Sequence, residues 1–252
     1  DMMGYGTYNQ PPGTWSDDTS MTLCTLDSLS KGLDYNDIMD KFVLWINEGE
    51  YTPYNEVFDI GITSQQAILK YIKGENPLDC GGKSEMDNGN GSLMRILPLG
   101  FYLYPDYVKN SSGDKDWYNK SLDKIMEIIH NISRLTHGHL RSQIACGIYT
   151  LVALKLMDAT SLKDGVYQGI SEAFNYYRSS DYMIKENHVE ELKHFSRLES
   201  TDFHKTLEEN IKSSGYVVDT LEAALWCLLT TNSYRDCVLK AVNLGEDTDT
   251  VA

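Results

Sequence analysis

Apolar residues recur at helical spacing through most of this chain, and this periodicity limits the fold more than any other feature of the sequence. The longest stripe repeats at i, i+3, i+4 and i+7 from Leu122 to Ile132. Shorter stripes lie in residues 38–46, 67–72, 144–152, 221–228 and 237–242. Alternating runs of strand type are few, and no Asn-Gly turn joins two of them. The sequence therefore predicts an all-α protein, with Gly245 placed to end the last of these helices.

No repeat period, low-complexity linker or clear domain boundary interrupts the 252 residues. A chain of this length with 41% hydrophobic residues can bury a substantial core. We therefore expect residues 1–252 to form one compact multi-helix domain. Two polar loops, at about 47–62 and 74–91, are placed to line a surface cleft. The charged segment 179–205 fits either a helix with a mixed face or an insertion.

The chain is strongly acidic, because 37 Asp and Glu residues outnumber 22 Lys and Arg residues and give a formal net charge of -15. This excess argues against nucleic acid and anionic membranes as partners. No apolar run is long enough to span a bilayer. Five scattered cysteines form no CxxC pair, which fits reduced thiols in a core. We expect a cytoplasmic protein without a membrane segment.

Two motifs rich in carboxylates and hydroxyls lie near the two ends of the sequence, GTWSDDTSM at 13–21 and GEDTDTVA at 245–252. Each fits a helix N-cap or a turn, where side-chain oxygens accept hydrogen bonds from free amides. Brought together, the same side chains would supply oxygen ligands for two divalent cations, which would relieve the repulsion among four carboxylates. Neither motif contains His or Cys, so Mg²⁺ or Mn²⁺ is favoured over Zn²⁺.

The segment MDNGNGSLMRILPLG, at residues 86–100, places two glycines in an Asn-rich loop, where the backbone can approach a ligand closely. A helix beginning at Ser92 would point its amides at an anion. Arg95 would then pair with a phosphate or a carboxylate. A tight turn with a structural Arg explains the segment equally well.

Two further motifs carry candidate ligand contacts. LTHGHL places His137 and His139 near a junction between helices, where a lone His is more often a hydrogen-bonding residue than a catalyst. SGYVVDTLEAALW places Tyr216 just before a helix. This Tyr is most simply a packing residue, although it would also suit stacking on a ligand base.

Taken together, the motifs WSDDTSM, GNGSLMRILPLG, LTHGH and LGEDTDTVA resemble the ADP-ribosylglycohydrolase family, in which they occur in this order. The resemblance spans about Gly13 to Ala252 and includes GYVVDTLEAALW as a weaker fifth motif. It implies a single all-α domain that carries two Mg²⁺ or Mn²⁺ ions. It also implies that the family's first helix, with a GDALG-like motif and an acidic residue, and its Gly/Ala-rich last helix lie outside this sequence.

The resemblance assigns roles residue by residue. The implied metal ligands are Ser16, Asp17, Asp18, Asp247, Asp249 and Thr250. The implied substrate contacts are Asn88, Gly89, Asn90, Gly91, Ser92, Met94, His137 and Tyr216. The candidate catalytic carboxylates are Asp18, Asp87 and Asp249, and Asp87 is explained equally well as a turn former. Ser16 departs from the family's commoner Thr, and Glu246 stands where many members have Gly.

The resemblance predicts hydrolysis at the anomeric carbon of ADP-ribose, with ADP-ribose or an ADP-ribosylated protein as the partner and arginine as the favoured acceptor. Metal ions would bind the ribose hydroxyls and activate a water, and carboxylates would hold the ions and accept a proton. Two alternatives remain open. One is a catalytically silent relative that binds ADP-ribose, and the other is a hydrolase of a small ADP-ribose compound or of another phosphorylated small molecule.

Overall fold

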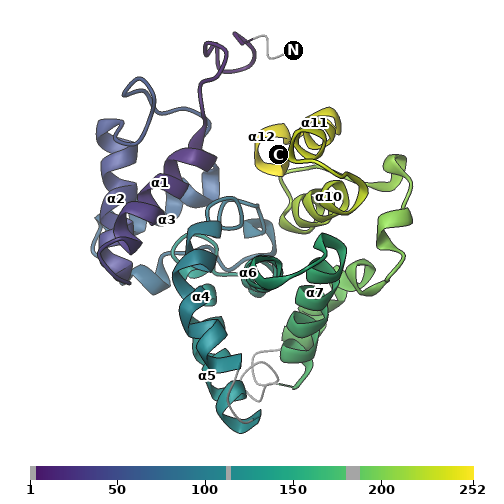
Figure 1. The fold of residues 1–252 in the computed structure, drawn as a ribbon. Helices are drawn as coiled ribbons and strands as arrows, with labels where there is room; N and C mark the ends of the chain where they lie inside the picture. The colour runs from purple at the N-terminus through teal and green to yellow at the C-terminus, as the bar shows by residue number, and fades with distance from the viewer. Residues whose placement is uncertain (1–3, 112–114, 180–187) are drawn as a thin grey trace.

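The computed structural model describes residues 4–111, 115–179 and 188–252 (Figure 1). Its α-helices are α1 (Asp17–Leu29), α2 (Tyr35–Glu48), α3 (Ile62–Ile72), α4 (Leu97–Ser111), α5 (Lys115–Arg134), α6 (Leu140–Asp158), α7 (Leu162–Ser179), α9 (His188–Leu192), α10 (Val217–Thr230), α11 (Tyr234–Asn243) and α12 (Thr248–Val251). Short 3-10 helices are η1 (Pro77–Asp79), η2 (Glu85–Asp87), η3 (Lys193–Glu199), η4 (Phe203–Lys205) and η5 (Glu208–Asn210). Within the described ranges the only β pairing is two isolated bridges, Gly82 with His137 and Gly89 with Tyr216. The predicted all-α class is confirmed.

Helix α6 lies at the centre of the molecule and contacts α4, α5, α7, α9 and α10 (Figure 1). Its apolar side chains are buried on every side, as expected of a core helix. The approach of α7 to α6 is close at Gly169, because a Cβ there would lie 2.5 Å from the Val152 Cα. The other helices are therefore arranged around α6, and their loops carry the candidate site.

The predicted apolar stripes differ in how deeply they are buried. The α5 stripe is buried from Leu122 to Ile132. The α11 stripe is a helix as predicted, but of its predicted face only Ala241 is buried, and Val242 is 45% exposed. Gly245 follows α11 in a left-handed conformation, with φ of 85°, and so ends the helix as predicted. The five cysteines are free thiols, of which four are buried.

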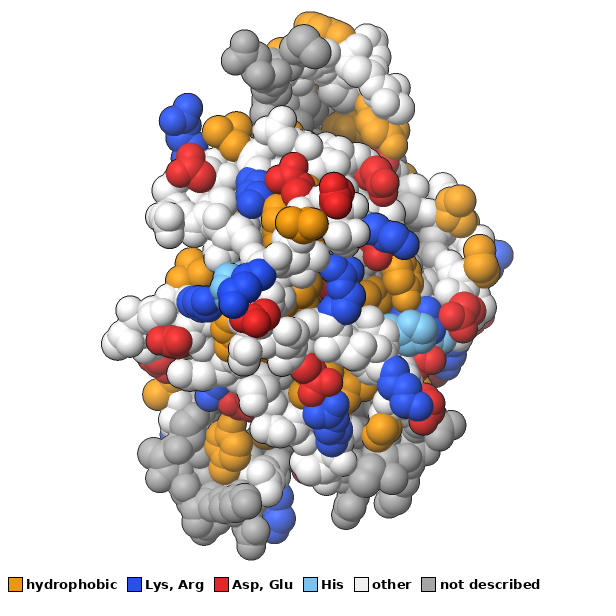
Figure 2. All heavy atoms as spheres, turned by 90° about the vertical axis from the view of Figure 1, so that its right-hand side faces the viewer, with side chains coloured by type: hydrophobic (Ala, Val, Ile, Leu, Met, Phe, Trp, Pro, Cys, Tyr) orange, Lys and Arg blue, Asp and Glu red, His pale blue; other side chains and the backbone are white. Residues whose placement is uncertain are grey.

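The described surface combines both signs of charge. On the face shown in Figure 2, Lys and Arg side chains are interspersed with Asp and Glu side chains. Surface ion pairs such as Arg178–Glu199 and Lys205–Asp202 follow this arrangement. No helix in the described part of the chain combines the length and the apolar character needed to cross a bilayer.

Candidate functional site

The two carboxylate motifs meet at one cavity, although they come from opposite ends of the described sequence. Helix α1 begins at Asp17 and α12 begins at Thr248, and both helix N-termini face a hollow of about 230 Å³. We call this hollow the acid cavity. It is lined by Asp17, Asp18, Asp59, Gly61, Ile62, Thr63, Ser64, Gly89, Asn90, Gly91, Met94, His137, Gly215, Asp247, Asp249 and Thr250.

Both motifs occupy helix N-termini, but neither acts as a side-chain cap. The Ser16 hydroxyl donates to Asp18 Oδ2 at 3.0 Å, and no amide of α1 donates to it. Asp247, the N-cap of α12, instead accepts a hydrogen bond from Asn90 Nδ2 at 2.7 Å. Asp34 at the start of α2 shows the difference, because its carboxylate accepts from two backbone amides. Five of the six predicted metal ligands therefore line the cavity, whereas Ser16 lies outside its lining and donates to Asp18.

The carboxylates of the acid cavity destabilise one another's charge. Burial raises the pKa of Asp17 to about 8, and repulsion from Asp18 and other carboxylates adds to the shift. Burial and repulsion from Asp249 raise the pKa of Asp18 to about 6, against hydrogen bonds from the Thr250 and Ser16 hydroxyls. Burial likewise raises the pKa of Asp247 above its usual value. A cation in the cavity would relieve this repulsion.

The donor set fits a hard divalent cation. Carboxylate and hydroxyl oxygens are the ligands that Mg²⁺ and Mn²⁺ prefer. Asp18 Oδ1 is buried and has no hydrogen-bond partner among the described residues, which leaves an oxygen available for coordination. No three His, Cys, Asp or Glu side chains of the described ranges are already drawn together into a metal cluster. The metal ligands therefore remain a prediction that the donor chemistry supports.

The Asn-Gly loop forms one wall of the acid cavity. Its backbone pairs with the segment before α10, where the Asn90 amide donates to the Gly215 carbonyl and the Val217 amide to the Asn88 carbonyl, both at 3.0 Å. Gly91 is required here, because a Cβ would lie 2.8 Å from the His137 ring and 2.9 Å from the Ser64 hydroxyl. Gly89 and Gly91 both line the cavity, and their predicted close approach to a ligand stays a prediction.

The helix predicted to begin at Ser92 is absent. Residues 91–95 form turns, and α4 begins at Leu97, with Pro98 accommodated in its first turn. The Ser92 side chain is fully buried and accepts a hydrogen bond from Ser133 Oγ at 3.0 Å. The prediction of a helix N-terminus that points its amides at an anion was therefore wrong. The Ser92 side chain faces the core rather than the cavity. Asn88 is also buried, and its side chain bonds Glu85 and Ser142.

Arg95 is a structural residue, as the alternative interpretation held. Its side chain is fully buried, donates to the Ile132 carbonyl and the Thr136 hydroxyl, and lies over the Phe42 ring at 4.9 Å. Burial lowers the pKa of Arg95 to about 10. Because the guanidinium does not reach the acid cavity, the predicted pairing with a ligand phosphate or carboxylate was wrong.

His137 lines the acid cavity, whereas His139 does not. The His137 ring is buried, and its Nδ1 lies 2.9 Å from the Thr136 hydroxyl. Burial lowers the pKa of His137 to about 3, and the nearby Arg95 charge contributes. His137 is therefore neutral near pH 7 and can donate or accept a single hydrogen bond per nitrogen. His139 caps α6 by accepting from the Arg141 amide at 3.2 Å.

Tyr216 belongs to a polar cluster beside the cavity rather than to its lining. Its backbone pairs with Gly89, but its hydroxyl accepts a hydrogen bond from Arg141 at 3.0 Å. The same buried guanidinium also pairs with Glu85 and Glu191. Tyr216 therefore fixes the start of α10 against the Asn-Gly loop, and its predicted contact with the nucleoside stays a prediction.

Asp87 does not line the acid cavity. Its carboxylate accepts two hydrogen bonds from Ser84, which close a capping box around η2. These bonds lower its pKa. A Cβ at Gly82 would collide with the carboxylate, at 2.4 Å from its carbon. The structure thus gives Asp87 the role of a turn former, and its catalytic role stays a prediction.

Asp59 is the cavity carboxylate that the sequence analysis missed. It lies in the loop before α3, adopts a left-handed conformation with φ of 56°, and accepts a hydrogen bond from the Tyr8 hydroxyl. A single Asp between Phe58 and Ile60 has no local pattern that distinguishes it from any other loop residue. The predicted role of the loop at 47–62 in lining a cleft is nevertheless confirmed by Asp59, Gly61 and Ile62.

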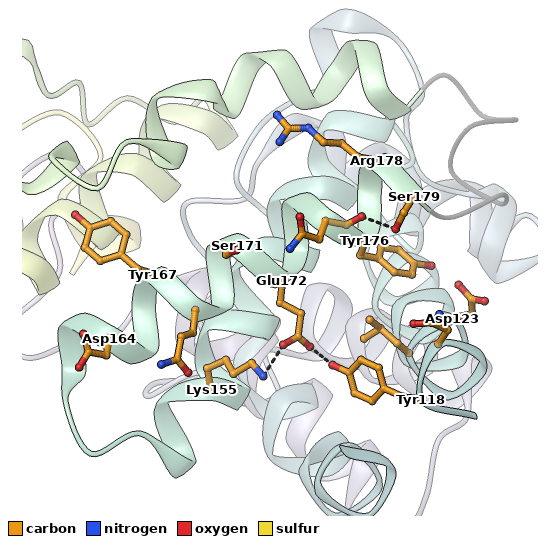
Figure 3. A pocket seen from close by; sticks show the side chains of 14 residues that line it. Tyr118, Asp123, Lys155, Asp164, Tyr167, Ser171, Glu172, Tyr176, Arg178 and Ser179 are labelled. Atoms are coloured by element: carbon orange, nitrogen blue, oxygen red, sulfur yellow. Dashed lines mark hydrogen bonds and ion pairs between the residues drawn. The ribbon is translucent and has the colours of Figure 1, made fainter. Parts of the chain in front are cut away.

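A larger hollow lies elsewhere, between α5, α6 and α7 (Figure 3). Its volume is about 1180 Å³, and none of the predicted site residues lines it. Figure 3 shows Glu172 at its floor, in an ion pair with Lys155 at 2.5 Å and hydrogen-bonded to Tyr118. Tyr107 also donates to Glu172, at 2.8 Å. This hollow therefore contains a carboxylate whose charge is already balanced.

Residues 1–252 match the sequence profile of the ADP-ribosylglycohydrolase family. The chain belongs to this family. The family's fold is also found by structural comparison, where the ADP-ribosylglycohydrolase-related protein complex superposes with a TM-score of 0.70 at 25% identity, covering 100% of this chain and 72% of that one.

Among family members with assigned activities, the chain is 30% identical over 256 residues to the ADP-ribosylarginine hydrolase Tri1 of Serratia proteamaculans. It is 31% identical to the same-named hydrolase of Pseudomonas putida and 28% identical to the ADP-ribosyl-dinitrogen reductase glycohydrolase of Rhodospirillum rubrum. The matches cover 99% or 100% of this chain, but 60%, 59% and 69% of the relatives. The chain thus spans about three fifths of the length of the two arginine hydrolases.

Proposed function

We propose that this ADP-ribosylglycohydrolase family member hydrolyses the bond between the anomeric carbon of ADP-ribose and an arginine side chain. The observation that carries the proposal is the convergence of the two carboxylate-bearing helix N-termini, α1 and α12, on a cavity walled by the Asn-Gly loop. Relatives named for ADP-ribosylarginine hydrolysis align with the whole of this chain, which supports arginine as the acceptor.

The residues that would hold two divalent cations, Mg²⁺ or Mn²⁺, are Ser16, Asp17, Asp18, Asp247, Asp249 and Thr250. When bound, such cations would supply positive charge that polarises ribose hydroxyls and lowers the pKa of a water. Asp249 is exposed in the cavity and is therefore the carboxylate best placed to accept a proton from that water.

The uncharged wall of the cavity would bind and orient the rest of the substrate. Gly89 and Gly91 leave room for a sugar or a diphosphate against the backbone. Neutral His137 adds hydrogen-bonding capacity without a positive charge that would repel the cations. Met94 supplies an apolar surface at the same wall. These residues would hold the ribose in one orientation relative to the carboxylates.

The proposal is tested by measuring ADP-ribose release from an arginine-ADP-ribosylated protein, with Mg²⁺ and with EDTA. We expect release that requires the cation. Release that EDTA leaves unchanged would overturn the metal assignment but not the hydrolase. If no ADP-ribose is released, the same assay with the serine-linked form and a direct ADP-ribose binding measurement would separate a different linkage from a silent binder.

A further inference from the structure

A second cavity adjoins the acid cavity on its outer side, and it differs in character. Its volume is about 770 Å³, and it shares Asp18, Asp59, Gly215, Asp247 and Asp249 with the acid cavity. We call it the vestibule. Its distinctive walls come from the segment before α1, from the loop before α3 and from the turn before α12. A group leaving the acid cavity through this side would pass these walls, so they are placed to contact the part of a substrate beyond the ribose.

Aromatic rings held in fixed positions form one wall of the vestibule. Trp15 is 38% exposed, and its indole N–H donates to the Tyr51 carbonyl at 3.0 Å, which fixes the ring at the surface. The Tyr8 ring packs on Phe58 with centroids 5.6 Å apart. These exposed aromatic surfaces are suited to a flat cation, because the face of an aromatic ring attracts positive charge.

Glu246 also lines the vestibule and has an unusual backbone conformation. Its φ is 55°, in the left-handed region that favours glycine. Its carboxylate is exposed and makes no hydrogen bond or ion pair with any described side chain. A strained backbone that presents an unpaired carboxylate beside a cavity is the kind of feature that a functional contact explains.

We propose that the vestibule binds the guanidinium group of the acceptor arginine, with Trp15 and Glu246 as the residues that select it. A ribosylated guanidinium is planar, positively charged and weakly hydrated, so it suits both a ring face and a carboxylate. Glu246 lies outside the predicted metal ligands, so bound cations leave its charge available. A serine acceptor carries no such cation. This inference rests on the proposed function, because the guanidinium belongs to the leaving group of the same substrate.

The test compares Glu246→Gln and Glu246→Gly with the unsubstituted whole chain in Mg²⁺. Glutamine removes the charge and keeps the strained backbone, whereas glycine removes both. We expect each variant to raise KM for an arginine-ADP-ribosylated peptide up to about fivefold, the size of an exposed charge pair, with a smaller change in kcat. The affinity for free ADP-ribose, measured by calorimetry, should be unchanged. Glu209→Gln, which removes an exposed charge that lines neither cavity, should alter neither.

The same two variants also provide the control for an effect on folding. Glycine is unstrained at a left-handed φ, so Glu246→Gly should keep or raise the Tm while KM rises. Trp15→Leu provides an independent arm, since it keeps apolar bulk and removes the ring face, and we expect about a threefold rise in KM for the same peptide.

The outcomes separate the two proposals. An unchanged KM in Glu246→Gln and Trp15→Leu, with an active parent chain, would overturn the vestibule assignment and leave the hydrolase intact. A parallel loss of ADP-ribose affinity would also overturn it, because the residues would then bind the ADP-ribose part. A parent chain that binds ADP-ribose but releases none from arginine would overturn the proposed function and this inference with it.

Discussion

The acid cavity is smaller than the hollow between α5, α6 and α7, and its carboxylates are less well compensated by protein groups. The hollow of Figure 3 is larger, about 1180 Å³ against about 230 Å³. Its central carboxylate, Glu172, already accepts from two tyrosines and pairs with Lys155. In the acid cavity the carboxylates mainly face each other, and one oxygen of Asp18 has no described partner. Of these two cavities, the larger is therefore the one whose charges are satisfied.

The comparison shows that the proposed site differs from the larger hollow by its unbalanced charge, and that it is not the more voluminous of the two. A buried carboxylate that stays charged costs free energy unless a cation compensates it. In the larger hollow the protein supplies that cation itself, as Lys155. In the acid cavity it supplies only hydroxyls and one amide, from Asn90. The Mg²⁺ or Mn²⁺ of the proposed function would supply this compensation.

The largest expected effect comes from neutralising a cavity carboxylate. Asp249→Asn should lower kcat for arginine-linked ADP-ribose by about a thousandfold or more, because charge that acts on the transition state is lost. Asp17→Asn should do the same. Circular dichroism should show a folded protein in each case. Activity within tenfold of the parent chain would contradict the assignment of the acid cavity.

The second largest expected effect is stabilisation by a bound cation, which should depend on the acid cavity and not on the hollow of Figure 3. Adding Mg²⁺ at about a hundred times its Kd should stabilise the protein by about 2.7 kcal/mol, since the ion binds only the folded state. This gain should disappear in Asp249→Asn and persist in Glu172→Gln. A thermal melt with and without EDTA measures it. A gain that survives in Asp249→Asn would place the ion elsewhere.

Glu172→Gln should have the reverse profile, with a loss of stability and no loss of activity. The substitution leaves Lys155 and two tyrosine hydroxyls without their charged acceptor, at a cost of about 1–3 kcal/mol. Chemical denaturation measures the cost, and kcat should stay within about twofold of the parent value. A large fall in kcat would show that the hollow of Figure 3 takes part in the reaction.

The smallest effect concerns His137, the neutral residue of the acid cavity. Its pKa of about 3 in the folded chain lies below the ordinary value of 6.5. Between these values the unfolded chain binds a proton that the folded chain does not, so stability falls as pH decreases below 6.5. At pH 5 the loss should be about 2 kcal/mol. In His137→Gln this part of the acid destabilisation should be absent, as denaturation at pH 7 and pH 5 would show.

The fold was predictable because its information is local. Helical spacing, as in the α5 stripe, needs only neighbouring residues, and the structure confirms the helices it indicated. Burial was less predictable. The α11 stripe has the same spacing, but its Val242 stays exposed. Among the described elements α11 packs mainly against α10 and α12, which leaves part of its apolar face uncovered.

The site was predictable in its composition and only partly in its geometry. The two carboxylate motifs were found because each combines several oxygen-bearing residues in a few positions. Asp59 was missed because it stands alone in its loop and reaches the cavity only through the packing of α3. Arg95 and Ser92 were placed wrongly for a related reason. A charged or hydroxyl side chain beside a glycine loop suggests a ligand, but here α5 and the Thr136 region supply their partners.

The meeting of α1 and α12 at one cavity also bears on how the protein is made. Chains emerge from the ribosome with their N-terminal part first, so Asp17 and Asp18 are in place long before the segment with Asp247 and Asp249 has been synthesised. A cation that bridges the two motifs would close a loop that includes nearly the whole described chain, and constraining so long a loop restricts the unfolded state strongly. Formation of the proposed reaction centre would then wait for synthesis of the α12 segment, and a chain terminated before that segment would carry half of the proposed site and no hydrolytic activity.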